Sequence, residues 1–189
     1  YHPWIGGVEK HVQDLAESLP QDFDVKVLCC REPGWKKNSS DEYRIPVLKA
    51  PSLAMLWSMP ISPAFICWYA REAATADIIH LHLPFPLAVL ANWIAAPKAK
   101  LIITWHSDIV RQRWASFFLS PLTRWILARA ERVIATSRSM LEHSRELAPF
   151  KAKGMVIPLG IRCEEFSAST ETSNQAQIIH WKYGPGPFI

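Results

Sequence analysis

The run of side chains best suited to chemistry follows an apolar stretch: His106, Ser107 and Asp108 stand in sequence, and Arg111 comes three residues later. A histidine ring can donate a hydrogen bond to a sugar or an oxyanion, and a carboxylate can accept one from a hydroxyl. Alternatively, Ser107 or Asp108 caps a following helix. Capping would account for Asp108 but leaves His106 unexplained, so both interpretations stay open.

A glycine pair, Gly6 and Gly7, directly precedes the first predicted helix. A helix start offers unpaired backbone N–H groups and a partial positive charge, which suit a phosphate. Glycine also lets a diphosphate approach the backbone closely. A simple turn is the alternative, and the pair taken alone favours it. The pair belongs to neither a GxGxxG nor a Walker A motif, so standard dinucleotide or P-loop binding is disfavoured.

His80 and His82 fall on the same face of one predicted strand, and His106 follows another strand. These three side chains could in principle hold a metal. The histidines do not have a third ligand at the sequence spacing of a known metal-binding motif. We therefore expect them to form hydrogen bonds and not a metal site. The letters HSD at 106–108 also resemble part of a hydrolytic triad, but the GxSxG nucleophile elbow is absent from the chain.

Residues 111–132 combine arginines with tryptophans and phenylalanines, and a basic, aromatic helix of this kind can lie on an anionic bilayer. The alternative is a core-facing helix pair with solvated arginines. The second interpretation is favoured because Leu119, Leu122, Ile126 and Leu127 also need a core. The chain's nine tryptophans indicate an apolar or glycan-like ligand surface nearby.

Strands alternating with helices must position these groups. Apolar spacing predicts a helix from residue 8 to about 19, and further elements follow at 24–30, 43–51 (a weak edge strand), 62–76, 77–83, 84–96, 100–105, 113–131, 132–137, 138–148 and 154–161. This alternation predicts an α/β fold, a doubly wound parallel sheet with helices on both faces. Ligands of such sheets bind outside the carboxyl ends of the strands. That rule nominates the loops at 105–108, 135–137 and 158–161.

Composition sets the broad class. The 189 residues are 49% hydrophobic and 20% charged, typical of a soluble globular domain or of half of a two-domain protein. A net charge of +4 fits anionic partners such as phosphates or an acidic membrane surface, and no nucleic-acid-binding signature appears. The four cysteines lack CxxC spacing, which indicates reduced thiols in a cytosol. No transmembrane stretch or signal peptide is recognisable.

Together these segments resemble the N-terminal domain of family-4 glycosyltransferases, retaining enzymes of the GT-B architecture. The form HSDIVRQ is similar to bacterial transferases that build lipopolysaccharide O-antigen or exopolysaccharide, many of them mannosyl- or rhamnosyltransferases. The resemblance covers most of the chain in the family's order, in the segments PWIGGVEKHVQDLA (3–16), DIIHLHLPFPLA (77–88), TWHSDIVRQR (104–113), AERVIATS (130–137) and VIPLGI (156–161).

On the donor side, the resemblance implies that Gly6 and Gly7 form the loop that meets the donor diphosphate. His106 matches the family histidine beside the transferred sugar, where it would act catalytically by steadying positive charge at the anomeric carbon. The diphosphate leaving group would be stabilised by helix N-termini and cations. No metal or cofactor is implied, and the nucleotide-diphosphate sugar is itself the donor substrate.

On the acceptor side, the resemblance implies that Glu9 and Lys10 face the acceptor and that Ser107, Asp108 and Arg111 shape its pocket. The implied reaction moves a hexose, for which mannose is a candidate, to a lipid-linked saccharide in cell-surface polysaccharide synthesis. We therefore expect a cytoplasmic protein with peripheral contact to the inner face of the plasma membrane. The alternative is a non-catalytic module that binds glycan or lipid and needs a separate partner domain.

The domain organisation expected from the family has an N-terminal Rossmann-like domain over residues 1–166 and a linker over 167–189. The family's first strand, central in its sheet, stands ahead of the glycine loop. Its nucleotide-binding C-terminal domain follows the linker and supplies most donor contacts. Neither matches a segment of this chain, so we expect an enzyme fragment whose activity on its own is doubtful.

Overall fold

The computed structural model describes residues 6–34, 43–56, 59–108, 113–160 and 181, without the side chains of 113–119. The chain divides into two compact units, Tyr1–Leu159 and Gly160–Ile189. The described elements up to β8 all belong to the first unit. The predicted domain boundary after residue 166 lies outside the described residues, so it stays a prediction.

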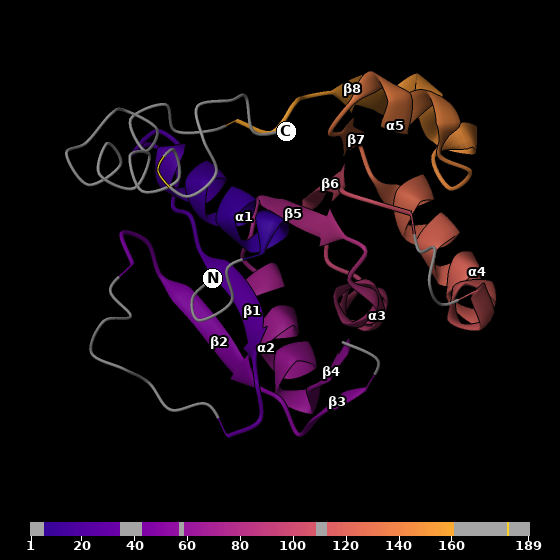
Figure 1. Cartoon of the computed structure of the whole chain (residues 1–189). Coiled ribbons are helices and arrows are strands. Elements are labelled where there is room, and N and C mark those ends of the chain that lie inside the picture. Colours follow the sequence, from indigo (N-terminus) through magenta and orange to yellow (C-terminus); the bar gives the residue numbers. More distant parts are fainter. Residues whose placement is uncertain (1–5, 35–42, 57–58, 109–112, 161–180, 182–189) are drawn as a thin grey trace. The chain divides into compact units, whose positions relative to one another are not determined.

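The largest sheet is parallel, as predicted, with its strands in the order β5-β6-β7-β8 (Figure 1). The strands span Ile78–Leu83, Lys100–Trp105, Arg132–Ala135 and Gly154–Val156. In the register, Leu83 lies opposite Trp105, and Trp105 lies opposite Ala135. The carboxyl ends of β5, β6 and β7 therefore meet at one edge of the sheet.

A second parallel pair joins β1 (Val27–Arg31) to β2 (Val47–Pro51). In the described part of the chain β1 pairs with β2 alone, and β5 pairs with β6 alone. The sequence predicts both strands of the pair, and β2 is an edge strand there, as its proline indicates. It does not predict the short antiparallel hairpin of β3 (Ala54–Leu56) and β4 (Met59–Ile61), because three-residue strands carry too little alternation to be recognised.

Helices cover both faces of the sheet. Helices α2 (Pro63–Ala73) and α3 (Pro86–Ala95) share the buried core with Ile79, Leu81 and Leu83, which point to one face of β5. Helix α1 (Gly7–Ser18) brings its histidine against the face that carries His80 and His82. This arrangement leaves the two β5 histidines between strand and helix rather than in the apolar core.

The remaining helical elements follow β6. Helix α4 (Arg113–Arg129) is a single helix with Pro121 inside it, where the sequence allowed one or two helices. In its described part Ile126 and Leu127 are fully buried, so the core-facing interpretation of this segment is confirmed there. Helix α5 (Arg138–His143) matches the start of the predicted 138–148 helix, but residues Ala148–Lys153 form a short 3-10 helix, η1.

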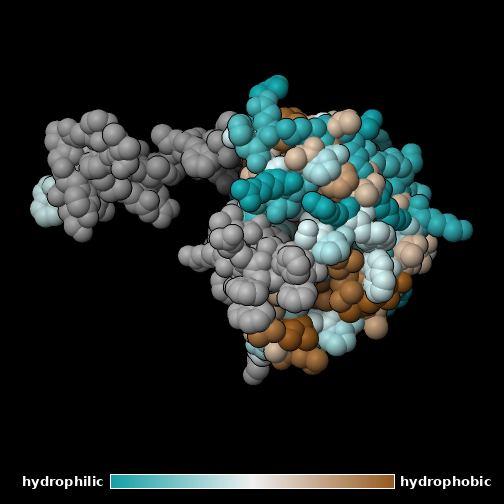
Figure 2. Space-filling view, turned by 90° about the vertical axis from the view of Figure 1, so that its right-hand side faces the viewer, coloured by the Kyte–Doolittle hydropathy of each residue, from teal (hydrophilic) through white to brown (hydrophobic). Residues whose placement is uncertain are grey.

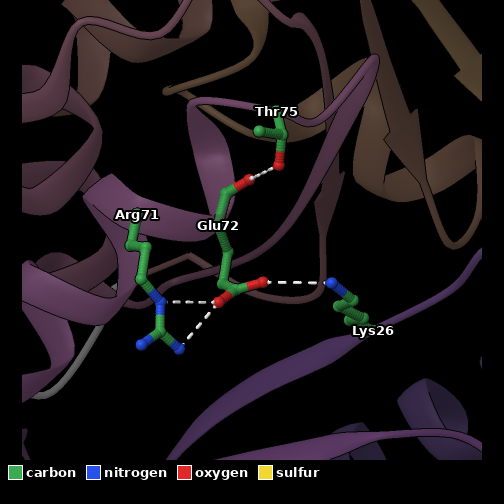
Figure 3. Close-up of polar contacts among 4 residues, drawn as sticks. All are labelled: Lys26, Arg71, Glu72 and Thr75. Carbon is green, nitrogen blue, oxygen red and sulfur yellow. Dashed lines mark hydrogen bonds and ion pairs between the residues drawn. The ribbon is translucent and has the colours of Figure 1, made fainter.

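A surface cluster around Glu72 joins α2 to the chain ahead of β1 (Figure 3). The Glu72 carboxylate accepts a hydrogen bond from Arg71 Nε at 3.0 Å and lies 3.3 Å from Lys26 Nζ. These hydrogen bonds, that of Arg71 first, lower the pKa of Glu72. Because the cluster is exposed, it contributes little to stability and orients the chain that leads into β1.

Candidate functional site

His106 sits at the carboxyl end of β6, one residue beyond the strand. Its backbone N–H donates to the carbonyl of Leu83 at 2.9 Å, which extends the β5–β6 ladder by one step. The ring is half-buried rather than free in solvent. The structure thus places His106 where ligands of parallel sheets bind, as the sequence predicts.

His82 on β5 lies beside His106. The Nδ1 atom of His82 and the Nε2 atom of His106 are 3.0 Å apart, so one ring donates a hydrogen bond to the other. The two rings stack with their centroids 5.3 Å apart and their planes 25° from parallel. This contact orients the His106 ring and couples its tautomer to that of His82, since one of the two nitrogens carries the shared proton and the other accepts it.

His80 continues the stack one strand step further from the edge. Its ring centroid lies 4.5 Å from that of His82, and its Nε2 atom lies 2.7 Å from Oγ1 of Thr104 on β6. Thr104 is itself buried. The hydrogen bonding expected for this histidine is therefore confirmed.

His11 on α1 completes the group, and sequence reasoning missed it. Its ring centroid lies 5.7 Å from that of His82 and 5.5 Å from that of His106, with planes at 68° and 70°. The signal that could have found it is its spacing: His11 follows Gly7 by four residues, so it lies on the same side of the helix as the predicted binding loop. The rotation of α1 against the sheet, which the sequence does not determine, decides which side that is.

The buried rings are kept neutral. Burial, and secondarily the charges of neighbouring rings, lower the pKa of His82 to about 2 and those of His80 and His106 to about 4. Burial also lowers the pKa of His11, although the charge of Asp14 opposes this. At neutral pH the cluster therefore consists of uncharged imidazoles, each offering one donor and one acceptor nitrogen.

These nitrogens also come close enough to act together on a cation. One ring nitrogen from each of His11, His82 and His106 lies within 4.8 Å of the other two. This trio differs from the one weighed in the sequence, because His11 stands in place of His80. The three histidines come from three different elements that are far apart in the sequence. No metal-binding sequence motif could therefore predict that they lie together.

The glycine pair stands at the start of α1: Gly6 is the N-cap residue and Gly7 is the first residue of the helix. No side chain caps this helix N-terminus. A Cβ atom at Gly6 would collide with the carboxylate of Glu9, which folds back over the helix N-terminus. An acidic group in the first turn is favourable there because of the helix dipole. The place predicted for the diphosphate is thus faced by Glu9, which also lies near enough for its charge to raise the pKa of His106 slightly against the larger effect of burial.

The predicted acceptor residues have different surroundings. Lys10 lies 3.3 Å from Asp14 in an i,i+4 ion pair on α1. Ser107 is exposed beyond β6. Arg111 lies outside the described residues. For none of these does the structure test the predicted role in acceptor binding.

Asp108 has structural contacts other than the helix cap that the sequence offers as an alternative, and the residues that such a cap would bind, 109–112, lie outside the described part of the chain. Its Oδ1 atom accepts hydrogen bonds from Nε1 of the buried Trp105 at 2.8 Å and from Oγ of Ser144 at 2.7 Å. Burial, together with the charge of Asp108 and a hydrogen bond to it, raises the pKa of Glu146 nearby. Asp108 therefore links the end of β6 to the segment after α5, and its predicted contact with an acceptor stays a prediction.

Comparison with protein families gives one match over most of the chain. Residues 5–165 match the model of Glycosyltransferase Family 4. The chain is 30% identical over 185 residues to the O-antigen chain mannosyltransferase C of Escherichia coli, covering 96% of this chain and 48% of that protein. It is 28% identical over 119 residues to the D-rhamnosyltransferase WbpZ of Pseudomonas aeruginosa, covering 63% of this chain and 30% of that protein. The chain thus spans half or less of the length of these curated relatives.

Solved structures share the fold at low sequence identity. The crystal structure of Anabaena Alr3699/HepE in complex with UDP and glucose superposes with a TM-score of 0.52 at 15% identity, over 81% of this chain and 50% of that one. The same protein in complex with UDP gives a TM-score of 0.51, also at 15% identity, over 82% of this chain and 50% of that one. The parallel α/β architecture is therefore that of about half of the Alr3699/HepE chain.

Proposed function

This chain belongs to glycosyltransferase family 4, and from that premise we propose that it forms the acceptor-side half of a retaining hexosyltransferase. The donor would be a nucleotide-diphosphate sugar and the acceptor a lipid-linked saccharide of a cell-surface polysaccharide. The proposal rests on one observation: His106 lies beside the first two turns of α1. His11, in the second turn, lies 5.5 Å from the His106 ring, measured between ring centroids.

The first turn of α1 would receive the donor diphosphate. The N–H groups at a helix start have no partner within the helix, and the helix dipole favours an anion there. Gly7 leaves the backbone open on the side where a Cβ would otherwise project, whereas at Gly6 that space holds the Glu9 carboxylate. Glu9 now lies over Gly6, so we propose that this carboxylate swings away when the diphosphate binds, which turns it toward the acceptor.

In the proposed reaction the bond between the anomeric carbon and the diphosphate oxygen breaks, and the nucleoside diphosphate leaves with the electron pair. The acceptor hydroxyl oxygen bonds to the same face of the sugar carbon and gives its proton to the departing diphosphate oxygen. His106 is uncharged, so it can lie beside the positively charged anomeric centre without repelling it. His82 is a positioning residue, because its hydrogen bond holds the ring of His106. The scheme needs no metal and no cofactor.

The nature of the substrates is the finer part of the proposal. The two curated relatives are named for mannose transfer to an O-antigen chain and for D-rhamnose transfer. We propose mannose as the first sugar to test, and we assign Lys10, Ser107, Asp108 and Arg111 to the acceptor side. A cytoplasmic location follows from this proposal, because nucleotide-diphosphate sugars and the lipid-linked acceptor would meet at the inner membrane surface.

A peripheral membrane contact fits one surface of the molecule. Figure 1 places α3 and the β3–β4 hairpin at the lower right, and Figure 2, which views that side, shows hydrophobic residues gathered in its lower part. No helix in the described part of the chain is long and apolar enough to span a membrane. We use the name α3–hairpin patch for α3 and the β3–β4 hairpin, whose exposed apolar residues are Leu90, Trp93 and Ile94 on α3 and Met55, Leu56 and Ile61 on the hairpin.

The experiment that tests the catalytic assignment is the substitution His106→Ala in the protein that contains this chain together with a nucleotide-binding half. We expect turnover of nucleotide-diphosphate mannose with a lipid-linked acceptor to fall about 100-fold, the usual cost of losing one transition-state contact. His143→Ala, at an exposed ring on α5, is the matched control and should leave turnover unchanged. Unchanged turnover in His106→Ala would contradict the role given to His106.

The enzyme hypothesis can also fail as a whole. The non-catalytic alternative is favoured by the α3–hairpin patch, since a module that docks on lipid needs only such a surface. Purified protein that neither transfers sugar nor hydrolyses any nucleotide sugar, and yet binds anionic liposomes, would support that alternative.

A further inference from the structure

The three imidazoles of His11, His82 and His106 converge from α1, β5 and β6. Two of the nitrogens, Nδ1 of His82 and Nε2 of His106, are already 3.0 Å apart. One ring nitrogen of His11 lies within 4.8 Å of a ring nitrogen of each of the other two histidines. All three side chains are half-buried, so the point between them is sheltered but open to small solutes.

We propose that His11, His82 and His106 form a binding site for a divalent transition-metal ion of the zinc type. Zinc binds histidine nitrogens at about 2.0–2.1 Å with tetrahedral geometry, which sets neighbouring ligand nitrogens about 3.4 Å apart. The His82–His106 separation is near that value already. Only the His11 ring, on a helix at the surface of the domain, needs to move by roughly an ångström.

The donor set selects the class of metal. Three neutral imidazoles suit zinc, copper, nickel or cobalt, whereas calcium and magnesium prefer oxygen ligands. Three histidines leave the fourth tetrahedral position for water or for an oxygen of a bound molecule. His80 is not a ligand of this trio, because its Nε2 atom is engaged with the Thr104 hydroxyl.

Metal binding does not change the number of protons that the imidazole rings carry. In the metal-free pair, one proton lies between Nδ1 of His82 and Nε2 of His106. When the metal takes both nitrogens, the ring that held this proton carries it on its other nitrogen instead. The buried rings are neutral before metal binds, so no proton has to be expelled near pH 7.

This site shares His106 with the proposed transfer, which needs no metal, and the two make opposite demands on that residue. A metal on Nε2 would remove that nitrogen from any contact with a sugar. We therefore expect zinc to inhibit the transfer, but binding is measured directly and does not depend on activity. Failure of the transferase hypothesis would leave the binding result intact.

The test is a titration of the tag-free chain with Zn²⁺ by calorimetry and with Co²⁺ by visible absorption. We expect one equivalent to bind, with the strong visible bands of tetrahedral cobalt. His11→Ala should weaken zinc binding at least about 100-fold, since loss of a mere outer hydrogen-bond partner of a metal ligand already costs 10–100-fold. His82→Ala should do the same.

Two matched controls decide the assignment. His143→Ala and His80→Ala should each change zinc affinity less than about threefold, while circular dichroism shows that every variant is folded. Tight zinc binding retained in both His11→Ala and His82→Ala, or an equal loss in His143→Ala, would overturn the proposal. Because His11 lies on α1 and not in the sheet, its variant stays informative even if His82→Ala fails to fold.

Discussion

The histidine cluster combines four like side chains that burial keeps uncharged. His80, His82 and His106 stack along β5 and the end of β6, and one hydrogen bond joins the rings of His82 and His106. A charged ring at any of these positions would face its neighbours' partial charges in a poorly solvated space. The cluster is therefore built to hold neutral hydrogen-bonding groups at the sheet edge.

This arrangement predicts a stability that depends on pH. In the folded chain the pKa values of His80 and His106 are lowered to about 4 and that of His82 to about 2, whereas an unfolded histidine titrates near 6.5. Below pH 6.5 the unfolded state binds more protons, so the free energy of unfolding falls as pH drops from about 6.5 toward 4.

Urea unfolding at a series of pH values between 7.5 and 4.5 measures this effect. We expect the unfolding midpoint to decrease steadily below pH 6.5 and the decrease to be smaller in His80→Gln than in the unsubstituted chain. The control variant His143→Gln should keep the full dependence. A midpoint that is constant, or that rises, as the solution is acidified would contradict the neutral cluster.

Asp108 gives a second prediction at the residue scale. Asp108→Ala leaves the buried Trp105 indole N–H and the Ser144 hydroxyl without their acceptor, so the free energy of unfolding should fall by about 1–3 kcal/mol. Thermal or urea unfolding measures this loss. Ser107→Ala, at an exposed position next to it, should change stability by less than about 0.5 kcal/mol.

The two possible roles of Asp108 separate in the same pair of variants. A stability loss identifies the structural role. If Asp108→Ala unfolds like the unsubstituted chain and instead raises KM for the acceptor alone, the hydrogen bonds to Trp105 and Ser144 contribute nothing and the acceptor role is the correct one.

Part of the site is readable from the sequence. His106 follows a recognisable buried strand, and parallel strands end at a common edge of the sheet. The sequence could therefore predict that His106 lies near His82. His11 could not be anticipated in the same way, because its approach depends on the rotation and docking of α1. The hydrogen bond from Ser144 to Asp108 could not be predicted either, since it is a tertiary contact between residues 36 positions apart.

At the scale of elements, local signals predicted most helices and strands. Ser62 before Pro63 marked the start of α2, and its Oγ atom indeed accepts from the Phe65 N–H at 3.1 Å. The buried strands β5 and β6 stood out as nearly continuous apolar runs. The β3–β4 hairpin escaped because its strands are short and largely exposed, so neither burial nor alternation signals them.

Ser62 does more than cap a helix, and this yields a prediction. Besides accepting from Phe65, its hydroxyl donates to the carbonyl of Pro51 at 2.6 Å, which ties α2 to the end of β2. Ser62 is fully buried. Ser62→Ala should therefore lower the free energy of unfolding by about 2 kcal/mol, the sum of a lost cap and a buried carbonyl left without a donor.

Ser137 offers the matched comparison, because it caps α5 in the same way at an exposed position, accepting from the Met140 N–H at 3.0 Å. Ser137→Ala should cost about 1 kcal/mol or less, since water replaces the lost bond. Chemical denaturation of both variants measures the difference. Equal losses in the two would show that the bond from Ser62 to Pro51 adds nothing.

At the scale of the whole molecule, the chain is 30% identical to a protein of which it covers 48%, and the fold matches about half of a solved relative. The cluster of His11, His82 and His106 lies at the carboxyl edge of β5 and β6, where family members would meet their substrates. Helix α3 of the α3–hairpin patch shares the core with Ile79, Leu81 and Leu83, on the face of β5 opposite to His80 and His82. The histidine cluster and the α3–hairpin patch are therefore separate surfaces of the domain.

The α3–hairpin patch carries the last prediction. Trp93 is 55% exposed and Ile94 is 53% exposed, and Lys98 and Lys100 follow them in exposed positions at the start of β6. Apolar side chains flanked by lysines fit a bilayer that contains anionic lipids, with the lysines meeting the headgroups. We therefore expect the chain to bind phosphatidylglycerol-containing vesicles more weakly as salt rises. Dissolved ions screen the attraction between the lysines and the anionic headgroups, and this screening becomes stronger at higher ionic strength.

Co-sedimentation with vesicles at increasing sodium chloride measures this binding, and Trp93→Ser should weaken it on the order of tenfold through lost apolar burial. Phe23→Ser is the matched control, because Phe23 is similarly exposed, at 54%, but lies in the turn between α1 and β1. If Phe23→Ser weakens binding as much as Trp93→Ser does, the contact is not specific to the patch. Binding that is independent of salt would remove the electrostatic part of the argument and leave only the apolar contact to explain membrane association.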